Sequence, residues 1–123
     1  MERKYEVIFC IINAGFSDTV MFAARKAGAF GGTVLKGRGI AGREAEERFK
    51  INIQPEKEIV MLLVPKEIKD SVLRSLYDFA GLNTEGQGIA FSMPVERAVG
   101  LKDFGDIDAP EEPAAAVHEE SKG

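Results

Sequence analysis

The order of the apolar segments along this chain predicts an α+β fold, with a four-stranded antiparallel sheet and two helices on one face. A segment with helix character lies between two segments with strand character in the first half, and the same order recurs in the second half. Two such units in sequence give the split βαβ, or ferredoxin-like, arrangement βαββαβ. The 123 residues suit a single domain of this kind.

The first unit begins with a strand over residues 5–12, which is a continuous apolar run rich in β-branched side chains. The helix that follows can be capped by Ser17 or Asp18 and extends to about residue 27. Small residues on its inward face allow close packing on a sheet: Val20, Ala23, Ala24 and Ala27. Residues 33–36 form the second expected strand.

The second unit begins with a strand over residues 58–64, which is apolar on both faces and is therefore expected inside the sheet. The next helix has a buried stripe spaced by four, four and three residues: Ile68, Val72, Leu76 and Phe79. Asp70 and Arg74 are spaced to pair on its solvent side. The last strand is expected over residues 89–93, and Pro94 confines it to a sheet edge.

The predicted strands are apolar on both faces, although two helices can cover only one face of the sheet. An uncovered apolar face of this size is typical of a protein–protein contact. The sequence pattern therefore predicts that the chain forms oligomers.

The charge is unevenly distributed between two parts of the chain. The formal net charge is −4, but residues 106–123 carry six acidic side chains and one lysine, so the rest is nearly neutral. This composition predicts a folded domain over residues 1–105 and an acidic, disordered tail over residues 106–123. A nearly neutral domain offers no extended basic surface for nucleic acid, so we expect no nucleic-acid partner.

The single cysteine and the single histidine do not indicate a metal site or a catalytic site. Cys10 lies within the first predicted strand, where a buried thiol is expected, and His118 lies in the tail. We therefore expect no enzyme, no metal and no prosthetic group. No apolar run approaches the ~20 residues that span a bilayer, and no signal peptide is evident. These observations predict a cytoplasmic protein without direct membrane insertion.

Two glycine-rich turns are the strongest indication of a ligand. Gly86-Gln87-Gly88 lies between the second helix and the last strand, and Gly37-Arg38-Gly39 follows the second strand. Glycines let a backbone approach a ligand closely and can direct successive N–H groups at one anion. Arg38 would add charge-assisted hydrogen bonds. A phosphate-bearing ligand is therefore the leading hypothesis, and tight turns without a ligand are the alternative.

Residues 5–102 resemble the PII family of signal-transduction proteins, in particular its atypical PII-like branch. The resemblance rests on Gly32-Thr33-Val34, on Gly37-Arg38-Gly39 before a long loop, on Gly86-Gln87-Gly88 followed by Phe91, and on the element order. It implies a homotrimer that binds adenine nucleotides (AMP, ADP or ATP) in clefts between subunits. It also implies that loop 39–57, the family's T-loop, regulates a target protein such as a membrane transporter or an enzyme.

The resemblance assigns nucleotide-binding roles to residues near the glycine turns, at the start of the second strand and near the end of the domain. In this assignment Thr33 contacts the adenine edge, and backbone N–H groups of both turns cradle the phosphates. The assigned residues are Thr33, Gly37, Arg38, Gly39, Asn83, Thr84, Gly86, Gln87, Gly88 and Lys102.

This chain departs from the family pattern at positions that serve the phosphates. Ile89 stands where typical members have a lysine, and their pair of basic residues near the last strand falls on Gly100 and Lys102, so one cation of three remains. The glutamine that follows the first glycine turn in typical members is absent, as is a tyrosine between Arg38 and Glu58. The pattern therefore predicts that AMP or ADP binds at least as tightly as ATP, and it argues against the typical mechanism of nitrogen regulation.

Two alternatives remain at the level of sequence. The chain could be a structural trimer of the same fold that binds no nucleotide. It could also be a phosphohydrolase, although Glu85 is the only acidic residue in the second glycine turn and general acid–base catalysis needs a second group within reach.

Overall fold

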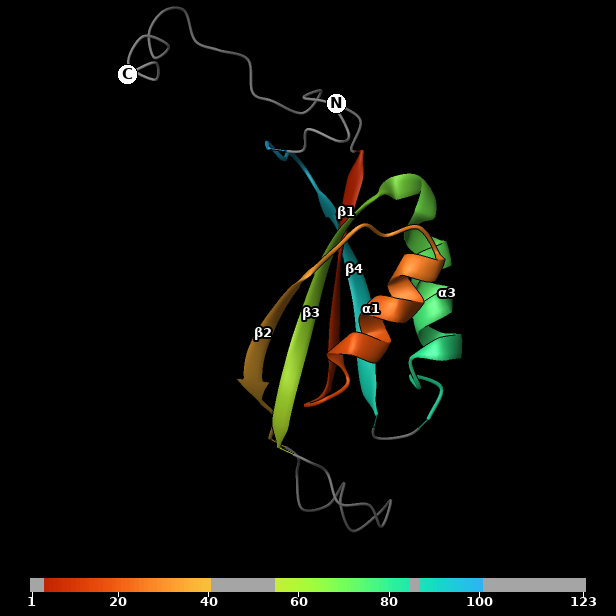
Figure 1. Ribbon diagram of the computed structural model, residues 1–123. Coiled ribbons are helices and arrows are strands. Elements are labelled where there is room, and N and C mark those ends of the chain that lie inside the picture. The colour runs from red at the N-terminus through yellow and green to blue at the C-terminus, as the bar shows by residue number, and fades with distance from the viewer. Residues whose placement is uncertain (1–3, 41–54, 85–86, 101–123) are drawn as a thin grey trace, which may run out of the picture.

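The computed structural model describes residues 4–40, 55–84 and 87–100 (Figure 1). Its strands are β1 (Tyr5–Asn13), β2 (Thr33–Arg38), β3 (Glu56–Pro65) and β4 (Gly88–Val95). Its helices are α1 (Ser17–Lys26), a 3-10 turn η1 (Lys66–Ile68) and α3 (Lys69–Phe79). The tail over residues 106–123 and most of loop 39–57 lie outside the described residues.

The four strands form one antiparallel sheet in the order β2-β3-β1-β4, and both helices lie on the same side of it (Figure 1). This order is that of the split βαβ arrangement, so the predicted fold class is confirmed. β4 is an edge strand, which accommodates Pro94 because a proline cannot donate to a neighbouring strand.

The hydrophobic core lies between the sheet and the two helices. Alternate residues of the central strands point into it, since successive side chains of a strand face opposite ways. The small α1 residues Ala23 and Ala24 are fully buried and bring this helix close to the sheet. The other fully buried core residues are Ile8, Cys10, Ile12, Val20, Val60, Leu62, Val64, Val72 and Leu76.

The opposite face of the sheet, which we call the open face, is also apolar. Its side chains alternate with those of the core, and the strand register places Phe91 directly opposite Phe9, with the two rings stacked at 5.6 Å between centroids. The described helices do not cover this face (Figure 1). Its large apolar residues are Val7, Phe9, Ile11, Leu35, Ile59, Met61, Leu63, Ile89, Phe91 and Met93.

The boundaries of the β2–β3 hairpin differ from those predicted. β2 continues through Gly37 and Arg38, and β3 already begins at Glu56. The pairs Gly37–Lys57 and Arg38–Glu56 extend the ladder beyond the apolar segment of both strands. Backbone pairing thus continues past the hydrophobic pattern on which the sequence prediction depended.

Two details of the helices also correct the sequence analysis. Phe16, rather than Ser17 or Asp18, occupies the N-cap of α1, with no side-chain hydrogen bond. Phe79 is not a core residue, because it lies at the last turn of α3 with 54% of its surface exposed. Its ring instead lies 4.9 Å from the ammonium of Lys26 on α1.

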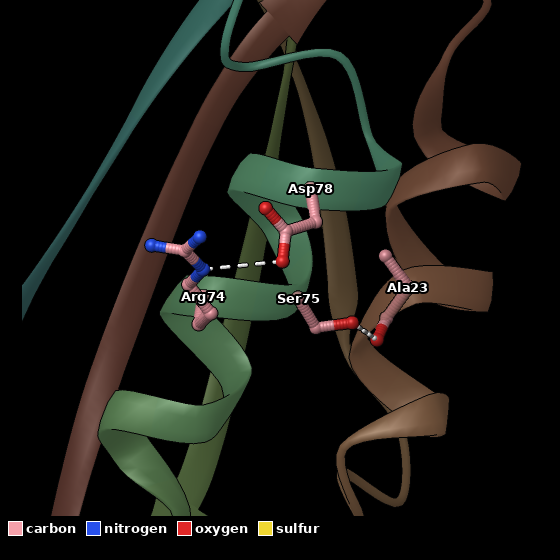
Figure 2. A network of polar contacts seen from close by, with 4 residues as sticks. All are labelled: Ala23, Arg74, Ser75 and Asp78. Carbon is pink, nitrogen blue, oxygen red and sulfur yellow. Dashed lines mark hydrogen bonds and ion pairs between the residues drawn. The ribbon is translucent and has the colours of Figure 1, made fainter.

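The helices are joined by a buried hydrogen bond, which Figure 2 shows. The Ser75 hydroxyl of α3 donates to the carbonyl oxygen of Ala23 on α1 at 2.6 Å, which satisfies the only buried polar side chain among the core residues described. On the outer side of α3, Arg74 pairs with Asp78 at 3.1 Å rather than with Asp70 as predicted (Figure 2). Asp70 pairs with Lys69 instead, at 3.3 Å.

Cys10 gives this core a defined response to alkaline pH. Burial raises the pKa of its thiol from 9.0 to about 12, because desolvation disfavours the thiolate. The raised pKa stabilises the folded state fully below about pH 9, and this contribution is lost as the pH rises from about 9 to 12.

We expect the free energy of unfolding in urea to fall more steeply above pH 9 for the unmodified protein than for Cys10→Ala. Equal slopes for the two proteins would contradict this assignment.

Candidate functional site

Both glycine turns lie at the same end of the sheet but on its opposite edges. Arg38 ends β2 and Gly88 begins β4, and the strands β3 and β1 lie between them (Figure 1). Three strand steps of about 4.8 Å place the two turns about 14 Å apart. Within one chain, therefore, the two turns do not form a single phosphate-binding site.

A row of polar side chains connects the two turns across the end of the sheet. Lys57 of β3 lies opposite both Gly37 of β2 and Asn13 of β1. The Lys57 ammonium donates to Asn13 Oδ1 at 2.7 Å, and Asn13 Nδ2 donates to Gln87 Oε1 at 3.2 Å. We call the chain Lys57–Asn13–Gln87 the polar row.

The sequence analysis did not assign Lys57 or Asn13 to the site. Lys57 was predicted at the end of the long loop, and Asn13 in the break after the first strand. Their proximity depends on the register between β1 and β3, which a single sequence does not reveal. A weak signal was present, because Asn13 directly follows the strand predicted over residues 5–12 and Lys57 directly precedes the strand predicted over residues 58–64.

Gly88 is required by the sheet, independently of any ligand. A side chain here would collide with the carbonyl oxygen of Ile11 and would lie 2.9 Å from Ile12 Cγ2. Gly81, after α3, has a φ of +81°, and the Gln87 side chain packs over it, 3.2 Å from the position of a Cβ atom. Both glycines thus hold the α3–β4 turn close to the end of β1.

Three residues assigned to nucleotide binding use their backbone N–H groups within the protein, and two of them, Gly39 and Gln87, belong to the turns expected to cradle phosphate. The N–H of Gly39 donates to the Pro55 carbonyl at 2.7 Å, which closes the β2–β3 hairpin. In the other turn, Thr84 N–H donates to Gly81 and Gln87 N–H donates to Thr84, at 2.9 and 3.3 Å. In this conformation, therefore, these three amides do not form an anion cradle.

The side chains of the predicted turn residues are nevertheless accessible. Arg38 is exposed at the end of β2, and Asn83 and Thr84 are exposed in the turn after α3, where the Thr84 hydroxyl and Asn83 Oδ1 lie 3.3 Å apart. Gly86 and Lys102 lie outside the described residues, so their predicted roles stay predictions.

Thr33 lies far from the glycine turns, at the first residue of β2. Arg38 lies five positions further along β2, which corresponds to about 17 Å along a strand. Thr33 belongs to an open, mainly apolar pocket of about 520 Å³ at the opposite end of the sheet. The pocket is lined by Val7, Phe30, Gly31, Gly32, Thr33, Met61, Leu63, Val95 and Ala98.

Residues 4–40, 55–84 and 87–100 contain neither a metal-binding cluster nor a membrane-spanning helix. In this part of the chain, no three His, Cys, Asp or Glu side chains are grouped so that they could hold a metal ion. Among the same residues, no helix is long and apolar enough to cross a membrane.

Comparison of the structure with solved structures identifies the fold. The chain is similar to the PII protein of Arabidopsis thaliana, solved bound to citrate, with a TM-score of 0.63 and 22% sequence identity. The alignment covers 82% of this chain and 83% of the Arabidopsis chain. No protein-family model and no curated protein matches the sequence. The chain therefore has a PII-like fold, as the sequence motifs predicted.

The packing of Gly88 leads to a testable prediction. Gly88→Ala is expected to lower the free energy of unfolding by about 1–3 kcal/mol, because the added methyl group must displace the end of β1. Gly31→Ala is the matched control, since a methyl group there meets no atom within 4 Å. Urea denaturation measures both variants. Equal stability of Gly88→Ala and the unmodified protein would show that the close approach to Ile11 is not maintained.

Proposed function

We propose that this protein is a homotrimeric regulatory protein of the PII-like type, in which a small anionic ligand binds between subunits. The observation that carries the proposal is the apolar open face. Phe91 and Met93 of the edge strand β4 keep 42% and 44% of their surface exposed in the single chain, although they belong to the apolar open face. Burying such a face against other copies of the chain removes this surface from water.

The separation of the predicted site residues supports a site shared between subunits. The pocket at Thr33 and the turn at Arg38 lie at opposite ends of β2, too far apart to bind one compact ligand from the same chain. Association of subunits around the open face would bring the pocket of one chain near a glycine turn of another. The site is thus expected to be complete only in the oligomer.

An adenine nucleotide is the ligand that we propose for this shared site. The apolar lining of the pocket suits an adenine ring, and the Thr33 hydroxyl can bond its edge. Arg38 and Lys102 would supply positive charge to the phosphates, and Lys57 of the polar row adds a cation that the sequence analysis did not include. The citrate bound to the Arabidopsis protein is likewise a small anion.

Regulation of a partner protein through loop 39–57 completes the proposal. The loop joins β2 and β3 directly beside Arg38 and Lys57, so a ligand charge at this end of the sheet can act on its base. We propose a cytoplasmic, non-enzymatic role in signal transduction, with a target such as a membrane transporter or an enzyme.

A trimer without a nucleotide is the second candidate. It is favoured by the internal hydrogen bonds of the Gly39, Thr84 and Gln87 amides, which would have to open before they could bind phosphate. Such a trimer would share the subunit contact but not the ligand.

The subunit contact can be tested by multi-angle light scattering. We expect a species of three times the 13.4 kDa chain mass. Phe91→Glu is expected to dissociate it, because a buried unpaired charge is strongly unfavourable. Phe22→Glu, at an exposed aromatic residue of α1, is the matched control and should remain trimeric. A monomer of the unmodified protein at micromolar concentration would refute the proposal.

The ligand can be tested by isothermal titration with AMP, ADP and ATP. AMP or ADP is expected to bind at least as tightly as ATP, because Ile89 and Gly100 replace two cations and each charged hydrogen bond contributes about 1.5–3 kcal/mol. Ile89 lies at the end of the open face, directly after Gly88, so Ile89→Lys is first checked for the trimer by light scattering. In the trimeric variant, ATP binding is expected to tighten about tenfold, or ~1.4 kcal/mol, and AMP binding to stay nearly unchanged. Ile89→Met is the control of similar size.

Two results would contradict this ligand assignment in different ways. Tight magnesium-dependent binding of ATP with no binding of AMP would show that the phosphate site is complete. No binding of any nucleotide by a trimer would support the second candidate. Hydrogen exchange of residues 39–57 during the same titration shows whether ligand binding reaches the loop.

A further inference from the structure

Asn13 is the central residue of the polar row. It ends β1, directly opposite Lys57 of β3, and it is half-buried, as are Lys57 and Gln87. Lys57 donates to its carbonyl oxygen at 2.7 Å, and its amide nitrogen donates to Gln87 at 3.2 Å. One side chain thus links a strand of the β2–β3 hairpin to the α3–β4 turn, 74 positions away in sequence.

The Asn13 amide satisfies both neighbours at once. The Lys57 ammonium can only donate, so its partner must accept, and the Asn13 amide accepts from Lys57 while it bonds the Gln87 amide. A leucine at this position would lack both a donor and an acceptor. The charged donor also strengthens the chain of hydrogen bonds through polarisation.

The two neighbours of Asn13 are themselves attached to the two glycine turns. The Lys57 stem packs against Gly39, where a Cβ atom would lie 2.9 Å from Lys57 Cε, at the point where loop 39–57 begins. The Gln87 side chain packs over Gly81 and directly precedes Gly88. A displacement of either turn therefore acts on Asn13.

We propose that Asn13 is a positioning residue that couples the α3–β4 glycine turn to the base of loop 39–57 through Lys57. The physical coupling does not depend on a ligand. Its role, which is to transmit ligand binding at the turn to the loop, rests on the proposed function. An ammonium group has three N–H donors, so Lys57 can keep its bond to Asn13 and also donate to a ligand phosphate. Asn13 then holds Lys57 ready for the ligand.

The coupling can be measured without any ligand, by the NMR signals of the Gln87 side-chain amide in the intact protein. Lys57→Met leaves Asn13 and Gln87 unchanged but removes the ammonium. We expect it to shift the Gln87 amide signals in the otherwise unmodified protein and to leave them unshifted in an Asn13→Ala background. Glu58→Gln, on the next residue of β3, contacts Gly15 instead and is the matched control, with no shift expected.

The same variants give a second measurement, the affinity for ADP by isothermal titration. Asn13→Ala is expected to weaken ADP binding about 2- to 10-fold, the cost of ordering one long side chain on binding. Once Lys57→Met is present, Asn13→Ala should have no further effect, since the two residues act together.

Each outcome separates this inference from the proposed function. An unshifted Gln87 signal in Lys57→Met overturns the coupling, even if Asn13→Ala fails to fold. Normal ADP affinity of a folded Asn13→Ala protein overturns the positioning role. A shifted Gln87 signal in a protein that binds no nucleotide supports the coupling and refutes the nucleotide proposal.

Discussion

The burial of two apolar sheet faces is the constraint on which the rest of this structure depends. The helices satisfy one face, where small residues such as Ala23 and Ala24 let α1 approach the sheet closely. The other face is equally apolar, and the stacked rings of Phe9 and Phe91 lie within it. A single chain of this size has no further element among its described residues to cover that face. The proposed assembly and the proposed shared site both follow from this imbalance.

The ends of the sheet differ in a way that suits two parts of one ligand. At one end, an apolar pocket contains a single hydroxyl group suited to hydrogen bonding, that of Thr33. At the other end, the apolar open face gives way to the polar row, where Lys57, Asn13 and Gln87 bond one another across the strands. A nucleotide has the same division into an apolar ring and charged phosphates. In one chain the two parts lie too far apart, so the proposed nucleotide site requires the proposed oligomer.

The internal hydrogen bonds of the turns define what a ligand must change. The Gly39 and Gln87 amides already donate to carbonyl groups, so a phosphate must either displace these bonds or use side chains. Arg38 is available at the edge, while Lys57 is held by Asn13 toward the middle of the row. This arrangement favours side-chain cations over a backbone cradle for the proposed ligand, and the loop response that we propose would begin at the base of the β2–β3 loop.

The sequence alone determined the element order, the fold class and the apolar character of both sheet faces, because strand and helix periodicity are local properties of the chain. The helix periodicity wrongly predicted that Phe79 is buried in the core. The apolar pattern also ended the second strand before Gly37 and Arg38, because it carries no information about pairing with the neighbouring strand. Only the tertiary structure showed that the two glycine turns lie on opposite edges, that Gly88 is required by Ile11, and that Asn13 and Lys57 meet. These contacts join residues more than 40 positions apart in the sequence. Their distances depend on strand order and register, which cannot be read from any one segment of the chain.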